Sequence, residues 1–104
     1  MRLIYHPDAE HEVIEAARFY EQRMTGLGER FLEEFDAAIA EVRGAPERWP
    51  EIEHHVRRYV MSRFPYGIFY RCDGQHLRIL VVKHHSRHPD YWRYRLESSP
   101  ESGT

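Results

Sequence analysis

Residues 66–83 read YGIFYRCDGQHLRILVVK, and this stretch predicts a β-hairpin within a sheet. Asp73-Gly74 separates two strand-like runs, Tyr66–Arg71 and Leu77–Lys83, and glycine supplies the positive φ that a tight turn needs. Apolar residues occupy both faces of the second run from Ile79 to Val82, which is typical of a central strand covered by helices. Val56–Met61 has the same β pattern, so three successive strands should form an antiparallel meander.

The chain before the meander has a helical pattern. Apolar residues recur at helical spacing from Asp8, which predicts an amphipathic helix of about 17 residues. Thr25–Gly28 interrupts the pattern, and a second apolar stripe runs from Phe31 to a stop at Gly44. Two helices joined by so short a turn should form an antiparallel hairpin on one face of the sheet.

The remaining segments complete the predicted fold. Arg2–Tyr5 is predicted to be a short first strand. Ala45–His55 is predicted to be a loop that Trp49 anchors to the core. Asp90–Arg95 is predicted to be a short helix that begins at Pro89. The small polar tail, residues 98–104, is expected to be disordered. The sequence thus predicts one α+β domain over residues 1–97. Its order is β-α-α-β-β-β, with an antiparallel sheet packed by the N-terminal helical hairpin and a short C-terminal helix.

Composition narrows the class of protein. A chain of 104 residues can bury one core without disulfides or a structural metal, and the single cysteine, Cys72, fits a reducing compartment. No apolar run approaches the roughly 20 residues that span a bilayer, and no basic segment followed by an apolar stretch opens the chain. We therefore expect a cytoplasmic protein that does not engage a membrane.

Charge is distributed unevenly along the chain. Residues 1–53 contain 6 basic and 13 acidic side chains, whereas residues 54–104 contain 9 basic and 4 acidic side chains and six of the eight histidines. This asymmetry suggests a face for an acidic partner, although solvated helix faces rich in glutamate would also explain the first half. Histidine, arginine and aromatic residues are most concentrated in the stretch Lys83–Arg95, which contains three of each. Such a composition suits a nucleic-acid or protein partner.

Several motifs in this half resemble the RelE/ParE toxin superfamily of bacterial toxin–antitoxin modules. They are Arg57-Arg58, the phrase RFPYGIFYR at residues 63–71, and an H-x-R-x-P-x-Y-W pattern at residues 85–92, which is similar to the ParE-like, plasmid-stabilisation branch. The resemblance extends from Leu3 to Arg95. It implies a microbial RNase-like sheet carrying a helical hairpin, and a cognate antitoxin whose C-terminal segment wraps the toxin.

The resemblance implies two alternative activities. ParE-like members poison DNA gyrase, whereas RelE-like members cut mRNA in the ribosomal A site. For the nuclease alternative, His85 is the candidate acid or base and Arg63 the candidate phosphate ligand. Many RelE-like enzymes resemble one another in an arginine three residues before the tyrosine of the penultimate strand, where this chain has Gly67. A sequence pI near 6.4 is also low for a protein that competes for RNA, so the gyrase-binding toxin is favoured.

The resemblance and the composition together nominate a recognition surface for the target or the antitoxin. Its candidate residues are Arg58, Arg87, Tyr91, Trp92 and Arg93. Tyr91 and Trp92 have an alternative role in closing the edge of the core.

Metal binding is a third alternative for the function. His11-Glu12-Val13-Ile14-Glu15 has the spacing of a zincin helix but carries Glu15 where the second histidine is required. His84, His85 and His88 could collect an ion only if the turn folded back. We therefore expect no metal and no cofactor.

Overall fold

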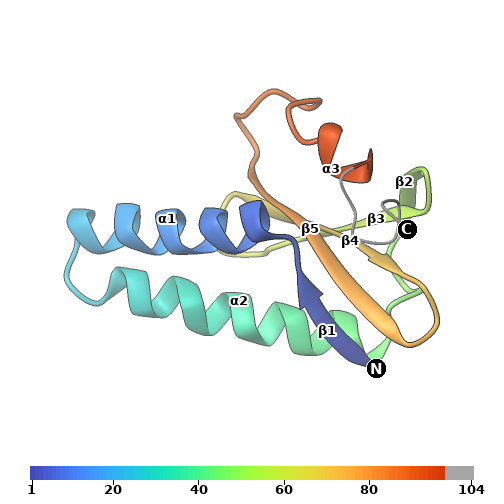
Figure 1. The fold of residues 1–104 in the computed structure, drawn as a ribbon. Coiled ribbons are helices and arrows are strands. Elements are labelled where there is room, and N and C mark those ends of the chain that lie inside the picture. The colour runs from blue at the N-terminus through green and yellow to red at the C-terminus, as the bar shows by residue number, and fades with distance from the viewer. Residues whose placement is uncertain (98–104) are drawn as a thin grey trace.

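The computed structural model describes residues 1–97 (Figure 1). In chain order the elements are β1 (Arg2–Tyr5), α1 (Pro7–Arg23), α2 (Leu27–Gly44), β2 (Glu51–Glu53), β3 (Val56–Val60), β4 (Tyr66–Cys72), β5 (His76–His84) and α3 (Tyr94–Glu97). This α+β architecture confirms the predicted fold class, and the tail predicted at 98–104 lies outside the described residues. Within 1–97, no helix combines the length and the apolar character that crossing a membrane requires.

The five strands form one sheet in the order β1-β5-β4-β3-β2. β3, β4 and β5 run antiparallel to one another, which confirms the predicted meander. At the hairpin turn Gly74 has a φ of 76°, and the N–H of Gln75 donates to the carbonyl of Asp73 at 2.9 Å. The turn therefore uses the glycine for the backbone conformation that only glycine adopts without strain.

The sheet is mixed rather than wholly antiparallel. β1 runs parallel to β5, with Leu3 opposite Leu77. A parallel neighbour needs a long crossover connection, and the helical hairpin followed by the meander supplies it. The residue pattern of a strand does not encode its direction, which is why the prediction of an antiparallel sheet does not hold for β1.

The segment expected to be a loop, Ala45–His55, contains the edge strand β2. Glu51 pairs with Arg57 of β3, and the intervening turn places His54 and His55 at φ 47° and 65°. Residues other than glycine adopt such angles rarely, so nothing in the sequence marked a tight turn here. Trp49, in contrast, packs against the main core as predicted.

The helical hairpin covers one face of the sheet and forms the main core with it. Phe31 and Phe35 of α2 are 0% and 2% exposed, and Phe31 lies in edge-on contact with Phe64 and Tyr66 at ring distances of 5.1 and 5.3 Å. α1 contributes small residues, Ala9, Val13 and Ala16.

The two helices approach closely at their turn because of Gly28. A Cβ at this position would lie 2.4 Å from the carbonyl oxygen of Ala17 in α1, a backbone atom that cannot move aside. The Glu21 carboxylate accepts hydrogen bonds from the N–H groups of Gly26 and Gly28, both at 3.0 Å, and so closes the N-terminus of α2.

The opposite face of the sheet is covered by residues 85–97, which we call the C-terminal segment. Trp92 is 1% exposed and packs edge-on against Phe69 of β4 at a ring distance of 5.2 Å and an angle of 70°. Val56, Leu80 and Val81 complete this second cluster. β5 is therefore covered by the helical hairpin on one face and by the C-terminal segment on the other.

The last helix begins later than predicted. Turns occupy residues 89–93, and α3 starts at Tyr94 rather than at Pro89. His88 Nδ1 accepts the N–H of Asp90 at 3.0 Å, and the Asp90 carboxylate pairs with Arg93 Nε at 2.8 Å. Such local side-chain bonds compete with helical hydrogen bonding, which explains the displaced start.

Candidate functional site

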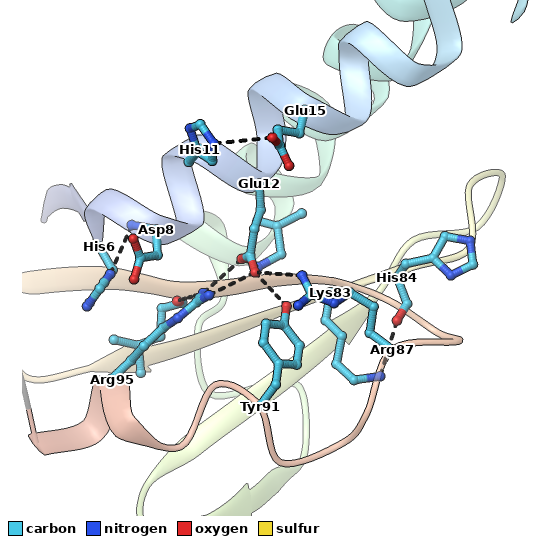
Figure 2. A network of polar contacts seen from close by, with 12 residues as sticks. His6, Asp8, His11, Glu12, Glu15, Lys83, His84, Arg87, Tyr91 and Arg95 are labelled. Carbon is cyan, nitrogen blue, oxygen red and sulfur yellow. Dashed lines mark hydrogen bonds and ion pairs between the residues drawn. The ribbon is translucent and has the colours of Figure 1, made fainter.

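Glu12 of α1 joins three parts of the molecule through one carboxylate (Figure 2). Its Oε1 accepts the N–H of Val82 at 2.9 Å and Arg95 Nη1 at 2.8 Å. Its Oε2 accepts the hydroxyl of Tyr91 at 2.5 Å and Arg95 Nη2 at 2.9 Å. The Glu12 side chain is 10% exposed and that of Arg95 is 4% exposed. This bidentate, largely dehydrated pair fixes the C-terminal segment to both α1 and β5.

Arg95 also binds the backbone of the sheet. Its Nη1 donates to the carbonyl of Leu80 at 2.9 Å, and its Nε donates to the hydroxyl of Tyr94 at 3.1 Å. The Tyr94 hydroxyl in turn donates to the carboxylate of Asp8 at the start of α1. Arg95 therefore acts as a structural cation rather than as a surface charge.

These contacts protect an incomplete edge of β5. β1 pairs with β5 only from His76 to Ile79, so Leu80–His84 has no neighbouring strand on that side within residues 1–97. Glu12 and Arg95 take one N–H and one carbonyl of this edge, from Val82 and Leu80. Side chains thus supply the hydrogen bonds that another strand would otherwise supply.

A groove of about 210 Å³ lies between this edge and α1. Its walls include Ala16 and the half-exposed ring of Phe19 from α1, and Val82 and His84 from β5. Arg87 borders the groove, with its guanidinium 3.8 Å from the ring centre of Tyr91 and 3.8 Å from Glu12 Oε2. Its side chain remains 54% exposed, so this cation is available to a partner.

The predicted recognition residues divide into exposed and buried groups. Arg58, Arg87 and Arg93 are exposed, and Tyr91 is half-buried. Burial and the hydrogen bond to Glu12 raise the pKa of the Tyr91 hydroxyl, which stays protonated as a donor. Trp92 belongs to the C-terminal segment, but its side chain is buried against the sheet. It is therefore not exposed on the recognition surface, where the sequence analysis placed it. The alternative role for Trp92, closing the core, is the one that its packing supports.

The two residues nominated for nuclease chemistry make different contacts. His85 is exposed after the end of β5. Partial desolvation of its ring lowers its pKa, and the positive charges of His84, Lys83 and Arg58 act in the same direction. Arg63 forms its ion pair with Glu34 of α2 at 3.8 Å. The contacts of Arg63 therefore lie toward α2, whereas the charged neighbours of His85 belong to β3 and β5. Among residues 1–97, no three His, Cys, Asp or Glu side chains gather to hold a metal ion.

Sequence reasoning missed Glu12 and Arg95, which organise the site. In the sequence analysis Glu12 appears only within the incomplete zincin pattern, but Glu12 lies three residues after Ala9 and four before Ala16, both buried. That spacing places it on the edge of the buried stripe and could have identified it. The partner, Arg95, lies 83 residues away and has no local pattern that distinguishes it from the other arginines.

Comparisons with known proteins agree with this architecture. A family model described as the ParE toxin of type II toxin–antitoxin systems, parDE, matches residues 3–89. The fold is similar to a solved structure titled "Chromosomal ParDE TA system from P. aeruginosa", with a TM-score of 0.60 and 18% sequence identity. The similarity covers 81% of this chain and 95% of the solved one. A search of curated proteins found no match.

Proposed function

The chain belongs to the ParE toxin family of type II toxin–antitoxin systems, and we propose that it arrests growth by binding DNA gyrase and that a cognate antitoxin neutralises it. The exposed cations Arg58, Arg87 and Arg93 and the half-buried Tyr91 are the proposed contact residues. Trp92 would act indirectly, by holding the C-terminal segment that carries three of them.

The observation that carries the choice of gyrase over mRNA is the close packing around Gly67. A Cβ on Gly67 would lie 3.1 Å from the Phe69 ring and 3.7 Å from the stem of Arg58, so a side chain at residue 67 would enter the face that Trp92 covers. An arginine here, as in RelE-like enzymes, would have to displace this packing. Because Phe69 and Arg58 occupy the space beside Gly67, a phosphate-binding arginine at residue 67 does not fit this packing, which favours the gyrase-binding toxin over the nuclease.

One assay in cells and two on the purified chain test this function. Induction of the gene in a bacterial host should arrest growth, and the protein should inhibit supercoiling by DNA gyrase while primer extension shows no A-site cleavage of mRNA. Arg87→Gln should weaken gyrase inhibition about tenfold, the effect of losing one charged hydrogen bond. Arg30→Gln, an exposed change of the same charge on α2, should leave inhibition unchanged.

Normal growth under strong induction would reject the toxin function. Cleavage of mRNA that disappears in His85→Ala or Arg63→Ala would replace the gyrase target with the ribosome-dependent nuclease.

A further inference from the structure

A second cleft, of about 230 Å³, lies where β3, β5 and the C-terminal segment meet. Three cations line it, namely Arg58 of β3, Lys83 of β5 and Arg93. The rings of Phe69 and Trp92 form part of its apolar wall. We call it the cationic cleft. It is distinct from the groove between α1 and β5.

The carboxylates of the cleft do not neutralise its cations. Glu53 and Asp90 also line it, and both pair with the same residue, Arg93, each at 2.8 Å. Within residues 1–97 neither Arg58 nor Lys83 forms an ion pair. The three cations therefore outnumber the two carboxylates, and the cleft keeps a net positive charge.

Two donors of the cleft are deeply buried. Lys83 is 9% exposed, and its ammonium has one contact, with the carbonyl of His84 at 3.2 Å. Its pKa is lowered by burial and then by Arg58 and Arg87. The indole N–H of Trp92 is buried with no hydrogen-bond partner among the described residues. Folded proteins pair almost all buried donors, so the indole N–H of Trp92 indicates a missing acceptor, and the ammonium of Lys83 has further hydrogens to donate beside its bond to His84.

We propose that the cationic cleft binds the carboxylate of an acidic side chain from a protein partner. Arg58 and Lys83 supply the opposite charge, and the rings of Phe69 and Trp92 suit the methylene groups of a glutamate. The volume lies below the roughly 300–1,000 Å³ of sites for whole small molecules. Glu53 and Asp90 at the same cleft would repel a chain of phosphates, which favours a single carboxylate over nucleic acid.

The antitoxin is the partner that this inference names, and in that respect it rests on the proposed function. The cleft can nevertheless be tested without an antitoxin, because one blocked amino acid reproduces its ligand. The chain has two tryptophans, and Trp49 packs against Tyr59 at a ring distance of 5.0 Å, on the other face of the sheet. Its indole N–H provides an internal control for that of Trp92.

The experiment is an NMR titration of the ¹⁵N-labelled full chain with N-acetyl-glutamate N-methylamide. We expect a saturable shift of the Trp92 indole signal, no shift for Trp49, and no saturable shift with the matching glutamine compound. Arg58→Gln should weaken binding about tenfold, as expected for one lost charged hydrogen bond. Arg58 is exposed, so this variant should fold, and Arg30→Gln provides the charge-matched control. Lys83→Met, checked for folding by circular dichroism, should have the same effect.

Equal responses to the glutamate and glutamine compounds, or no saturable response, would overturn the proposal. Tighter binding of inorganic phosphate, lost in the same two variants and competed by an oligonucleotide, would also overturn it and assign the cleft to nucleic acid. A negative titration beside intact growth arrest would remove this inference alone. A saturable titration beside normal growth would remove the toxin function and leave the cleft.

Discussion

The two faces of the sheet are closed in different ways. The helical face buries a continuous aromatic core in which Phe31 contacts several other rings. The opposite face has a small cluster around Trp92 and is held by the Glu12–Arg95 pair. Removing volume from a close-packed apolar core lowers the free energy of unfolding, whereas a buried ion pair is stabilising only while both partners keep their charge. The first face should therefore set the stability of the fold, and the second should set the position of the proposed contact residues.

The largest expected effect is a loss of packing on the helical face. Phe31→Ala removes a fully buried ring and should lower the free energy of unfolding by about 3–5 kcal/mol in urea denaturation. Leu32→Ala is the neighbouring control, because Leu32 is 38% exposed and its truncation should cost well under half as much. Equal losses in the two variants would show that the aromatic core does not dominate stability.

The next effect concerns the opposite face. Glu12→Gln leaves the guanidinium of Arg95 buried without its counter-charge, and should lower the free energy of unfolding by about 3 kcal/mol. Amide hydrogen exchange should rise in the C-terminal segment more than in α2. Glu15→Gln, whose carboxylate is 65% exposed beside His11, should change neither measurement appreciably. If the two variants behave alike, the pair does not hold this face.

The smallest effect is a pH dependence at the same face. The hydrogen bond from Tyr94 lowers the pKa of Asp8 below its usual 3.8. The folded state therefore favours the carboxylate, so this contribution is complete well above pH 3.8 and is lost as the pH falls through the lowered value. Protection factors of the amides around α3, corrected for the intrinsic exchange rate at each pH, should fall on acidification in the native chain, and less so in Asp8→Asn. An identical acid response in both would remove Asp8 from this role.

Much of the fold follows from local patterns in the sequence. Asp73-Gly74 identified the β4–β5 hairpin, and the apolar spacing identified both helices, because turns and helix faces depend on residues close in sequence. β2 escaped prediction because a three-residue strand is too short to show alternation. The late start of α3 depends on bonds from His88 and Asp90 that compete with a reasonable helical pattern.

The candidate site was less predictable for a physical reason. The stretch around Arg87 and Tyr91 could be nominated from composition, but its geometry depends on contacts between distant residues, such as Glu12 with Arg95. Lys83 lies within an apolar strand and gave no indication that its charge would be buried without a carboxylate beside it. Such pairings arise from topology, and one sequence does not encode them locally.

The parallel pairing of β1 with β5 has a consequence for synthesis. Residues 2–5 precede every other strand and helix of the described fold in translation, yet their partners are residues 76–79. A nascent chain can form the helical hairpin early, because that contact is local, while β1 remains unpaired until most of the chain has been translated. Translation products that end before residue 76 therefore lack a complete sheet.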